Sequence, residues 1–294
     1  MKKDLTWKDY LADNARYADF INAFAYEGKE IVHADDIMEC DTANADGTNR
    51  DLLRKIALGF QCAIFGIEHQ ENLDYAYPVR EMGYTYNTYN KQVKNIKAHN
   101  KKYPKILSSR ERLYKFRKDD RLFPTITYLL YAGEEEWDGP TSLKDMLILD
   151  HLPKALQEAV QNYKIQLIDI HKLTEEEVNR LRTDLRHIFN LIRLSKDDIG
   201  FEKEIINNQD YYTKMPEDAY NLASHYTKLN ASIKIKTDEG GIDVCQAIEK
   251  MKIKEQEKTT LELIRNAMES LKMSFDEVCD ALKVKDREQY RNVI

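Results

Sequence analysis

The chain has 294 residues, of which 42% are hydrophobic and 33% are charged, and its formal net charge is −6. This composition predicts an ample core, arranged as one large domain or two modest ones. No apolar run approaches the roughly 20 residues needed to span a bilayer, and the first twenty residues lack the apolar stretch of a secretory signal. We therefore expect a cytoplasmic protein with no membrane partner.

Cysteine spacing excludes a zinc site of the usual kind. The four cysteines are far apart in the sequence, and none belongs to a CxxC motif or a Cys/His cluster. In a reducing compartment we expect them to be free thiols. They are Cys40, Cys62, Cys245 and Cys279.

The first elements in chain order are a helix and a strand. Apolar residues at helical spacing predict a helix over residues 5–27, and residues 28–50 read as an irregular connection with a short extended piece. Residues 50–60, "RDLLRKIALGF", are ambiguous between strand and helix. Residues 61–70, "QCAIFGIEHQ", predict a strand, because a long apolar run ends there in polar residues.

A long helix and two further strands follow. Residues 77–102 predict a helix with Pro78 in its first turn, where proline is tolerated. β-Branched and aromatic residues predict strands over 122–133 and 163–173.

The pattern changes at Thr174. A capping box, Thr-Glu-Glu-Glu, opens a predicted helix over residues 174–194, and nearly everything after it is helical. Gly240-Gly241 interrupts this region, and an apolar stripe follows at Leu261, Ile264, Met268 and Leu271. We expect an α/β domain over residues 1–173 and a helical C-terminal region over 174–294.

Polar side chains at the end of strand 61–70 are candidates for a metal site. Glu68 and Gln70 are two residues apart and therefore share one face of the strand. Mg²⁺ prefers oxygen ligands, and a second carboxylate from Asp51 or Asp46 would complete a pair beside a scissile phosphate. The pattern alone is also compatible with a solvated strand end and with Asp51 on an exposed helix.

Several motifs resemble one protein family. They are "GIEHQ", "YAYPVREMGY" and "DDRLFPTITYLLYAGEEEWDGPTSLKDML", preceded by "NRDLLRK" and "ARYADFINAFAYEGKEIV" and followed by "GGIDVCQAIEKM". In this order they are similar to the recombination-promoting nucleases, also called YhgA-like putative transposases, of the PD-(D/E)XK nuclease superfamily. The similarity touches most of the chain.

The resemblance implies a restriction-endonuclease-like core, a mixed sheet flanked by helices, and Mg²⁺-dependent endonucleolytic cleavage of DNA linked to recombination, with Mn²⁺ as an alternative cation. Asp51 and Glu68 would bind the metal, with the backbone carbonyl of His69 as a further ligand. Gln70 would stand where the superfamily carries a lysine; it can orient a water but supplies no positive charge. Asp19 on the first helix would assist the metal.

A second class of function stays open from the sequence. The chain could keep the nuclease fold without activity, as a DNA-binding or oligomerisation module, and the C-terminal helices could form a homo-oligomer. The two classes differ in whether Asp51, Glu68 and Gln70 converge in space.

Two groups of side chains are candidates for DNA contact. Arg80 and Tyr84 are four residues apart and therefore share a helix face. Either they contact a phosphate beside the metal, or the Arg80 guanidinium stacks on a core tyrosine. Residues 91–121 carry twelve Lys/Arg against three acids, which predicts either a binding site for a polyanion or a solvated helix and loop. We expect phosphate contacts that do not read sequence from Lys91, Lys94, Lys97, Lys101 and Lys102.

Overall fold

The computed structural model describes residues 6–40, 51–58, 61–230, 232–284 and 286–291. Asp46, the second candidate for the upstream carboxylate, lies outside these residues. The chain divides into two compact units. Unit 1 joins the residues up to Glu204 with Asn221–Thr227, and unit 2 joins Ile205–Tyr220 with the residues from Lys228 onward. The predicted division at residue 173 stays a prediction.

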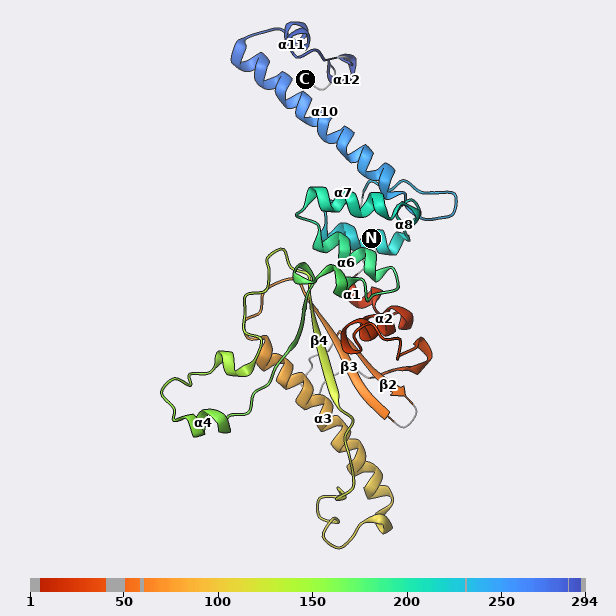
Figure 1. The fold of residues 1–294 in the computed structure, drawn as a ribbon, viewed down its shortest axis with the longest axis vertical. Coiled ribbons are helices and arrows are strands. Elements are labelled where there is room, and N and C mark those ends of the chain that lie inside the picture. The colour runs from red at the N-terminus through yellow and green to blue at the C-terminus, as the bar shows by residue number, and fades with distance from the viewer. Residues whose placement is uncertain (1–5, 41–50, 59–60, 231, 285, 292–294) are drawn as a thin grey trace. The chain divides into compact units, whose positions relative to one another are not determined.

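A five-stranded sheet forms the centre of unit 1 (Figure 1), with the strand order β1-β2-β3-β4-β5. The first three strands are antiparallel, and β3, β4 and β5 run parallel. The mixed sheet with flanking helices and the helical C-terminal region confirm the predicted fold class. The strands are β1 (Ile37–Glu39), β2 (Leu52–Leu58), β3 (Gln61–Gln70), β4 (Thr125–Tyr131) and β5 (Gln166–Asp169).

The strand predictions differ in accuracy. β3 has the predicted bounds, whereas β4 and β5 are shorter than predicted. Residues 52–58, where the sequence was ambiguous, form β2, which lies between β1 and β3 with most of its residues buried. Consecutive residues of a strand point to opposite faces, so the run of buried residues shows that neither face of β2 is left to water, and such a strand needs no alternation of polar and apolar residues.

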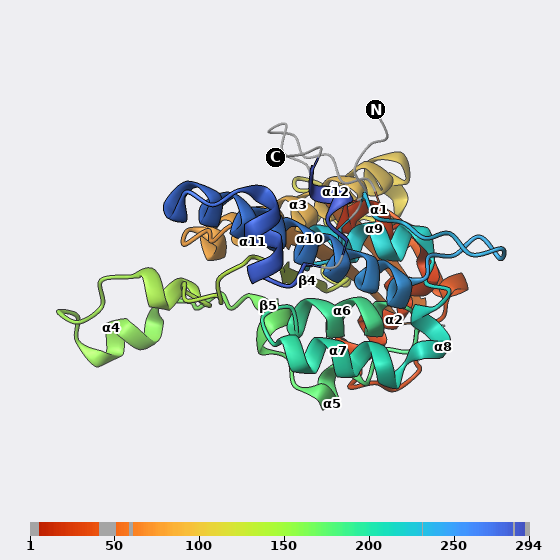
Figure 2. The ribbon, with the colours of Figure 1, turned by 90° about the horizontal axis from the view of Figure 1, so that it is seen from above.

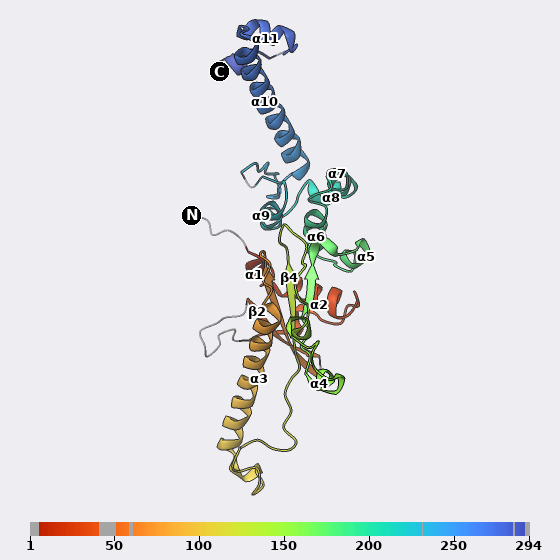
Figure 3. The same cartoon turned by 90° about the vertical axis from the view of Figure 1, so that its left-hand side faces the viewer.

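Helix α2 (Asn14–Ala25) covers one face of the sheet (Figures 1 and 3). The Tyr17 hydroxyl donates to the Phe65 carbonyl at 2.9 Å, and the Phe20 ring meets Tyr128 edge-on. Side chains alternate along a strand, so Phe65, Ile67 and His69 share this face.

Helix α3 (Tyr77–Lys102) covers the opposite face (Figure 3). Tyr77 packs in a buried cluster with Leu129, Tyr131 and Trp137. By the same alternation Glu68 and Gln70 of β3 belong to the α3 face.

The predicted helix over residues 5–27 is wrong in one respect, because it is two helices. α1 (Trp7–Tyr10) begins with a capping box at Thr6, and α2 begins after Asp13, whose carboxylate accepts the Arg16 N–H. A capping side chain within a helical pattern starts a new helix because it satisfies one of the first free N–H groups.

The predicted helix after Thr174 is also divided. The Thr174 capping box is present and opens α5 (Glu175–Val178). The helix then stops, and α6 (Leu185–Arg193) begins after Asp184. The carboxylate of Asp19 accepts the backbone N–H groups of Arg182 and Thr183, so it holds the chain in the gap between these two helices.

Short helices complete unit 1. They are η1 (Ala34–Asp36), η2 (Pro104–Ile106), η3 (Leu143–Met146), α4 (Lys154–Ala159) and η4 (Ile170–Lys172). Helix α4 lies apart from the strands of the sheet (Figure 2).

The remaining elements are all helices. They are α7 (Asp198–Asn207), α8 (Gln209–Tyr212), α9 (Glu217–Tyr226), α10 (Val244–Leu271), α11 (Phe275–Ala281) and α12 (Glu288–Arg291). At the end of unit 2 the predicted stripe of α10 contributes Ile264 to a buried cluster with Val278, Cys279 and Tyr290. Among the described residues, no helix is long and apolar enough to cross a membrane.

Candidate active site

Asp51 and Glu68 face each other where β2 begins and β3 ends. Leu52 pairs with Ile67 in the antiparallel ladder. In the same register the next residues, Asp51 and Glu68, lie opposite each other. The Asp51 N–H lies 3.3 Å from Glu68 Oε1, and the His69 N–H donates to Asp51 Oδ2 at 3.0 Å. Asp51 therefore lies at the start of a strand and not on a helix, and each carboxylate reaches the backbone of the other strand.

The surroundings of this pair suit a hard divalent cation. Glu68 is 4% exposed, and Asp51 and Gln70 are half-buried. The Gln70 side chain makes no hydrogen bond with the described residues, which leaves its amide oxygen available. Two carboxylates and an amide are the oxygen donors that Mg²⁺ accepts while it keeps several waters. Within the described part of the chain, no three His, Cys, Asp or Glu side chains gather as a metal centre.

The His69 side chain turns to the α2 face and packs between two aromatic rings. Its ring centroid lies 6.2 Å from that of Trp7 and 5.9 Å from that of Tyr226, and its Nε2 lies 3.2 Å from the Tyr226 hydroxyl. Burial lowers the pKa of His69 from 6.5 to about 4. The imidazole is therefore neutral at pH 7, and it is the backbone of His69 that faces the carboxylate pair.

Two residues that the sequence did not single out complete this arrangement. The Tyr226 hydroxyl donates to Glu71 Oε1 at 2.6 Å, and the His225 Nε2 lies 3.4 Å from the same oxygen. Burial alone would raise the pKa of Glu71, but the hydrogen bond from Tyr226 and the two histidines outweigh it and lower the pKa. No sequence spacing predicts this contact, because Tyr226 is 155 residues from Glu71.

Arg80 and Tyr84 lie in the first turns of α3. The Arg80 guanidinium pairs with Asp74 at 2.7 Å and stacks over the ring of Tyr77, 4.8 Å from its centroid. The cation therefore stacks on a buried tyrosine, but this tyrosine is Tyr77 and not Tyr84. Phosphate contact by Arg80 or by Tyr84 remains a prediction.

Asp19 has a different environment from the one expected of a metal ligand. It is 6% exposed, and besides the two backbone N–H groups it accepts the Thr183 hydroxyl at 2.6 Å. These donors occupy both carboxylate oxygens, so we leave Asp19 out of the proposed site.

The five lysines predicted to contact DNA lie in the C-terminal half of α3. Lys94, Lys101 and Lys102 are exposed, and Lys91 and Lys97 are partly exposed. Gln92 exchanges hydrogen bonds with the backbone of Phe123, and Tyr89 accepts the Thr125 N–H at the start of β4. Since β4 runs parallel to β3, its start lies at the opposite end of these strands from Glu68, and the C-terminal part of α3 extends beyond that end (Figures 1 and 3).

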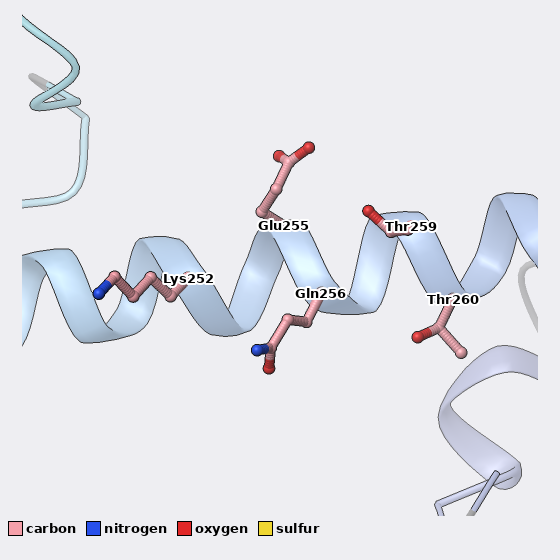
Figure 4. Close-up of a pocket in the computed structure, with 5 residues that line it drawn as sticks. All are labelled: Lys252, Glu255, Gln256, Thr259 and Thr260. Atoms are coloured by element: carbon pink, nitrogen blue, oxygen red, sulfur yellow. The ribbon is translucent and has the colours of Figure 1, made fainter. Parts of the chain in front are cut away.

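A hollow on α10 contains no predicted site residue. It is lined by five side chains of this one helix (Figure 4). They are Lys252, Glu255, Gln256, Thr259 and Thr260. These side chains do not form a cluster of catalytic groups, and we assign the hollow no role.

Comparison with known families gives one match. Residues 51–219, more than half of the chain, match the family described as "Putative transposase, YhgA-like". The match begins at Asp51 and includes β2 to β5 with all of α3. No curated protein and no solved structure matches the chain. The chain belongs to the YhgA-like transposase family.

Proposed function

We propose that the protein is a Mg²⁺-dependent endonuclease that hydrolyses phosphodiester bonds of DNA in recombination. The observation that carries this proposal is the approach of Asp51 and Glu68, linked by contacts of 3.3 and 3.0 Å between one residue's carboxylate and the other strand's backbone. Membership of a transposase-like family, whose name points to DNA as the substrate, agrees with it.

Asp51 and Glu68 would hold the cation. The Asp51 and Glu68 carboxylates lie on adjacent strands, and two adjacent carboxylates repel each other unless a cation lies between them. A bound divalent ion acidifies a coordinated water and neutralises charge on the phosphate oxygens. Gln70 lies on the same face of β3 and orients the attacking water through its amide oxygen.

Arg80 would bind a phosphate only if its guanidinium contacted both the phosphate and Asp74. Its Nη1 is already paired with Asp74, so a phosphate competes with that carboxylate. The hydrolytic role therefore depends on Asp51, Glu68 and Gln70, and Arg80 adds affinity.

Nicking of supercoiled plasmid tests the proposal. The wild-type protein should nick the plasmid with Mg²⁺ or Mn²⁺ and not with EDTA, and Asp51→Asn should lose this activity. Glu158→Gln serves as the control, because Glu158 is an exposed carboxylate on α4. Equal nicking by wild type and Asp51→Asn would show that the metal site lies elsewhere.

One observation favours the alternative, a nuclease fold that binds DNA without cutting it. Only two acids converge among the described residues, and a neutral glutamine stands at the position of the superfamily's lysine. Metal-independent DNA binding without nicking, in a folded wild-type protein, would support this second function.

A further inference from the structure

The connection between α3 and β4 contains an ordered turn, residues 108–118, which we call the basic turn. The carboxylate of Glu111 accepts the Ser108 N–H at 2.9 Å, the Ser108 hydroxyl at 2.6 Å and the Lys118 N–H at 2.9 Å. The buried side chain of Asn100 on α3 donates to the Lys115 carbonyl at 3.0 Å. The turn is therefore closed on itself and fixed to the end of α3.

The positive charge of the turn outweighs its negative charge. Five basic residues and one acid, Glu111, lie in the turn, and none of the five basic side chains forms an ion pair or a hydrogen bond with the described residues. Glu111 closes the turn, and the carboxylate of Asp120, just after the turn, accepts the Arg117 N–H and the Asn100 amide. The five residues are Arg110, Arg112, Lys115, Arg117 and Lys118.

Two large side chains at the tip face water. Leu113 is 76% exposed and Tyr114 is 69% exposed. They lie directly between Arg112 and Lys115 in the sequence. Exposed side chains of this size, with an excess of basic residues around them, form a surface on which an aromatic ring and phosphate-binding groups act together.

We propose that the basic turn binds DNA at unpaired bases, with Tyr114 stacked on a base and Arg110 and Arg112 on the adjacent phosphates. This deepens the proposed function and depends on it, because it names the kind of DNA that the protein prefers: single-stranded or forked DNA over a continuous duplex.

The combination of charge and exposed ring favours unpaired nucleic acid over a smooth duplex. Phosphate contacts alone do not distinguish the two. An aromatic ring stacks only on a base face that is free, and such stacking tolerates every sequence because all bases present a π-face. The lysines of α3 continue the cationic surface toward the sheet, so a strand bound at the turn has phosphate contacts along the helix.

Binding in EDTA separates this inference from catalysis. The probes are one fluorescent oligonucleotide as a single strand, as a blunt duplex and as a forked duplex, titrated by anisotropy with the full-length protein. Tyr114→Ala should weaken binding to the single strand and the fork by about 5- to 150-fold, the range that corresponds to loss of one base–aromatic stack. Binding to the blunt duplex should change by less than about twofold, and Tyr114→Phe should behave as wild type.

Tyr86→Ala is the matched control, because Tyr86 is an exposed tyrosine (64%) on α3 outside the turn. It should leave all three affinities unchanged. Equal losses in Tyr86→Ala and Tyr114→Ala, equal losses on all three probes, or no loss in Tyr114→Ala would overturn the assignment. If wild type binds the probes and Tyr114→Ala has no effect, this inference fails while the proposed function stands; if wild type binds the probes but nicks no plasmid with Mg²⁺, the proposed function fails while this inference is still tested.

Discussion

The end of β3 and the basic turn are electrostatic opposites. At the strand end two carboxylates lie together, whereas in the turn five basic residues lie together with one acid, Glu111. Each region is therefore complementary to a different part of the proposed complex, the first to a metal ion and the second to phosphates. From this difference we expect that substitutions can alter DNA cleavage and DNA affinity separately.

The largest expected effect is at the strand end. Glu68→Ala should reduce metal-dependent nicking by about two orders of magnitude or more, since metal stabilisation of the transition state is worth several kcal/mol. DNA affinity, measured by anisotropy, should stay equal or rise slightly because a negative charge is removed.

Far-UV circular dichroism and thermal unfolding serve as the controls for Glu68→Ala. An unfolded variant would show that Glu68 is structural, and unchanged nicking would contradict the separation of the two regions.

Asp19 should behave as an acid that stabilises the fold. Asp19→Ala removes the acceptor of two N–H groups and one hydroxyl, so we expect the free energy of unfolding to fall by about 2–4 kcal/mol. Denaturant unfolding measures this. At a temperature where the variant is folded, its metal-dependent nicking should equal that of wild type; a selective loss of nicking would return Asp19 to the metal site.

Charge reversal on α3 should change affinity without changing chemistry. Replacing Lys94, Lys97 and Lys101 by glutamate should weaken duplex binding and make the slope of log affinity against log salt shallower by roughly 0.9 for each lost phosphate contact. Titrations at two salt concentrations measure the slope. An unchanged slope would mean that these lysines only solvate the helix.

The smallest effect concerns the order of the basic turn at low pH. The Ser108 hydroxyl and the backbone N–H groups of Lys118 and Ser108 lower the pKa of Glu111 from 4.5 to about 2. An acid whose pKa is depressed on folding stabilises the fold above its unfolded pKa, and this contribution is lost as the pH falls through the folded value. Exchange protection of the Lys118 amide should therefore fall progressively as the pH drops from about 5 to about 2. Glu111→Gln, which lacks the charge, should show weaker protection than wild type at about pH 5 and little pH dependence below it, and equal protection at about pH 5 would contradict the role of the carboxylate.

The sequence predicted those elements whose signals are local. The bounds of β3 were correct because one continuous apolar run ends in polar residues at both sides, and the Thr174 capping box was correct because all of its atoms come from neighbouring residues. The placement of Asp51 beside Glu68 agrees with the spacing of a hairpin, although its role as a metal ligand stays a prediction.

Long-range contacts explain what the sequence could not predict. The gap between α5 and α6 is set by Asp19, more than 160 residues earlier. Tyr226 contacts His69 and Glu71, although it lies 155 residues from Glu71 and outside the family match over residues 51–219. No short stretch of the sequence therefore contains Tyr226 together with these two residues. The orientation of Arg80 toward Asp74 depends on the turn that precedes α3, which residue spacing does not determine.

The length of α3 has a consequence for where on DNA the protein would act. The helix has 26 residues, and at 1.5 Å per residue it measures about 39 Å. The start of α3 follows the strand that ends in Glu68 and Gln70. Near its end, Asn100 holds the basic turn by a hydrogen bond to the Lys115 carbonyl. About 39 Å corresponds to roughly 11 base pairs of B-DNA at 3.4 Å each. If both proposals hold, we expect α3 to set the distance between the cut position and the first unpaired base, so inserting or deleting whole turns in it should shift the cut position by one to two nucleotides for about every 5.4 Å of helix.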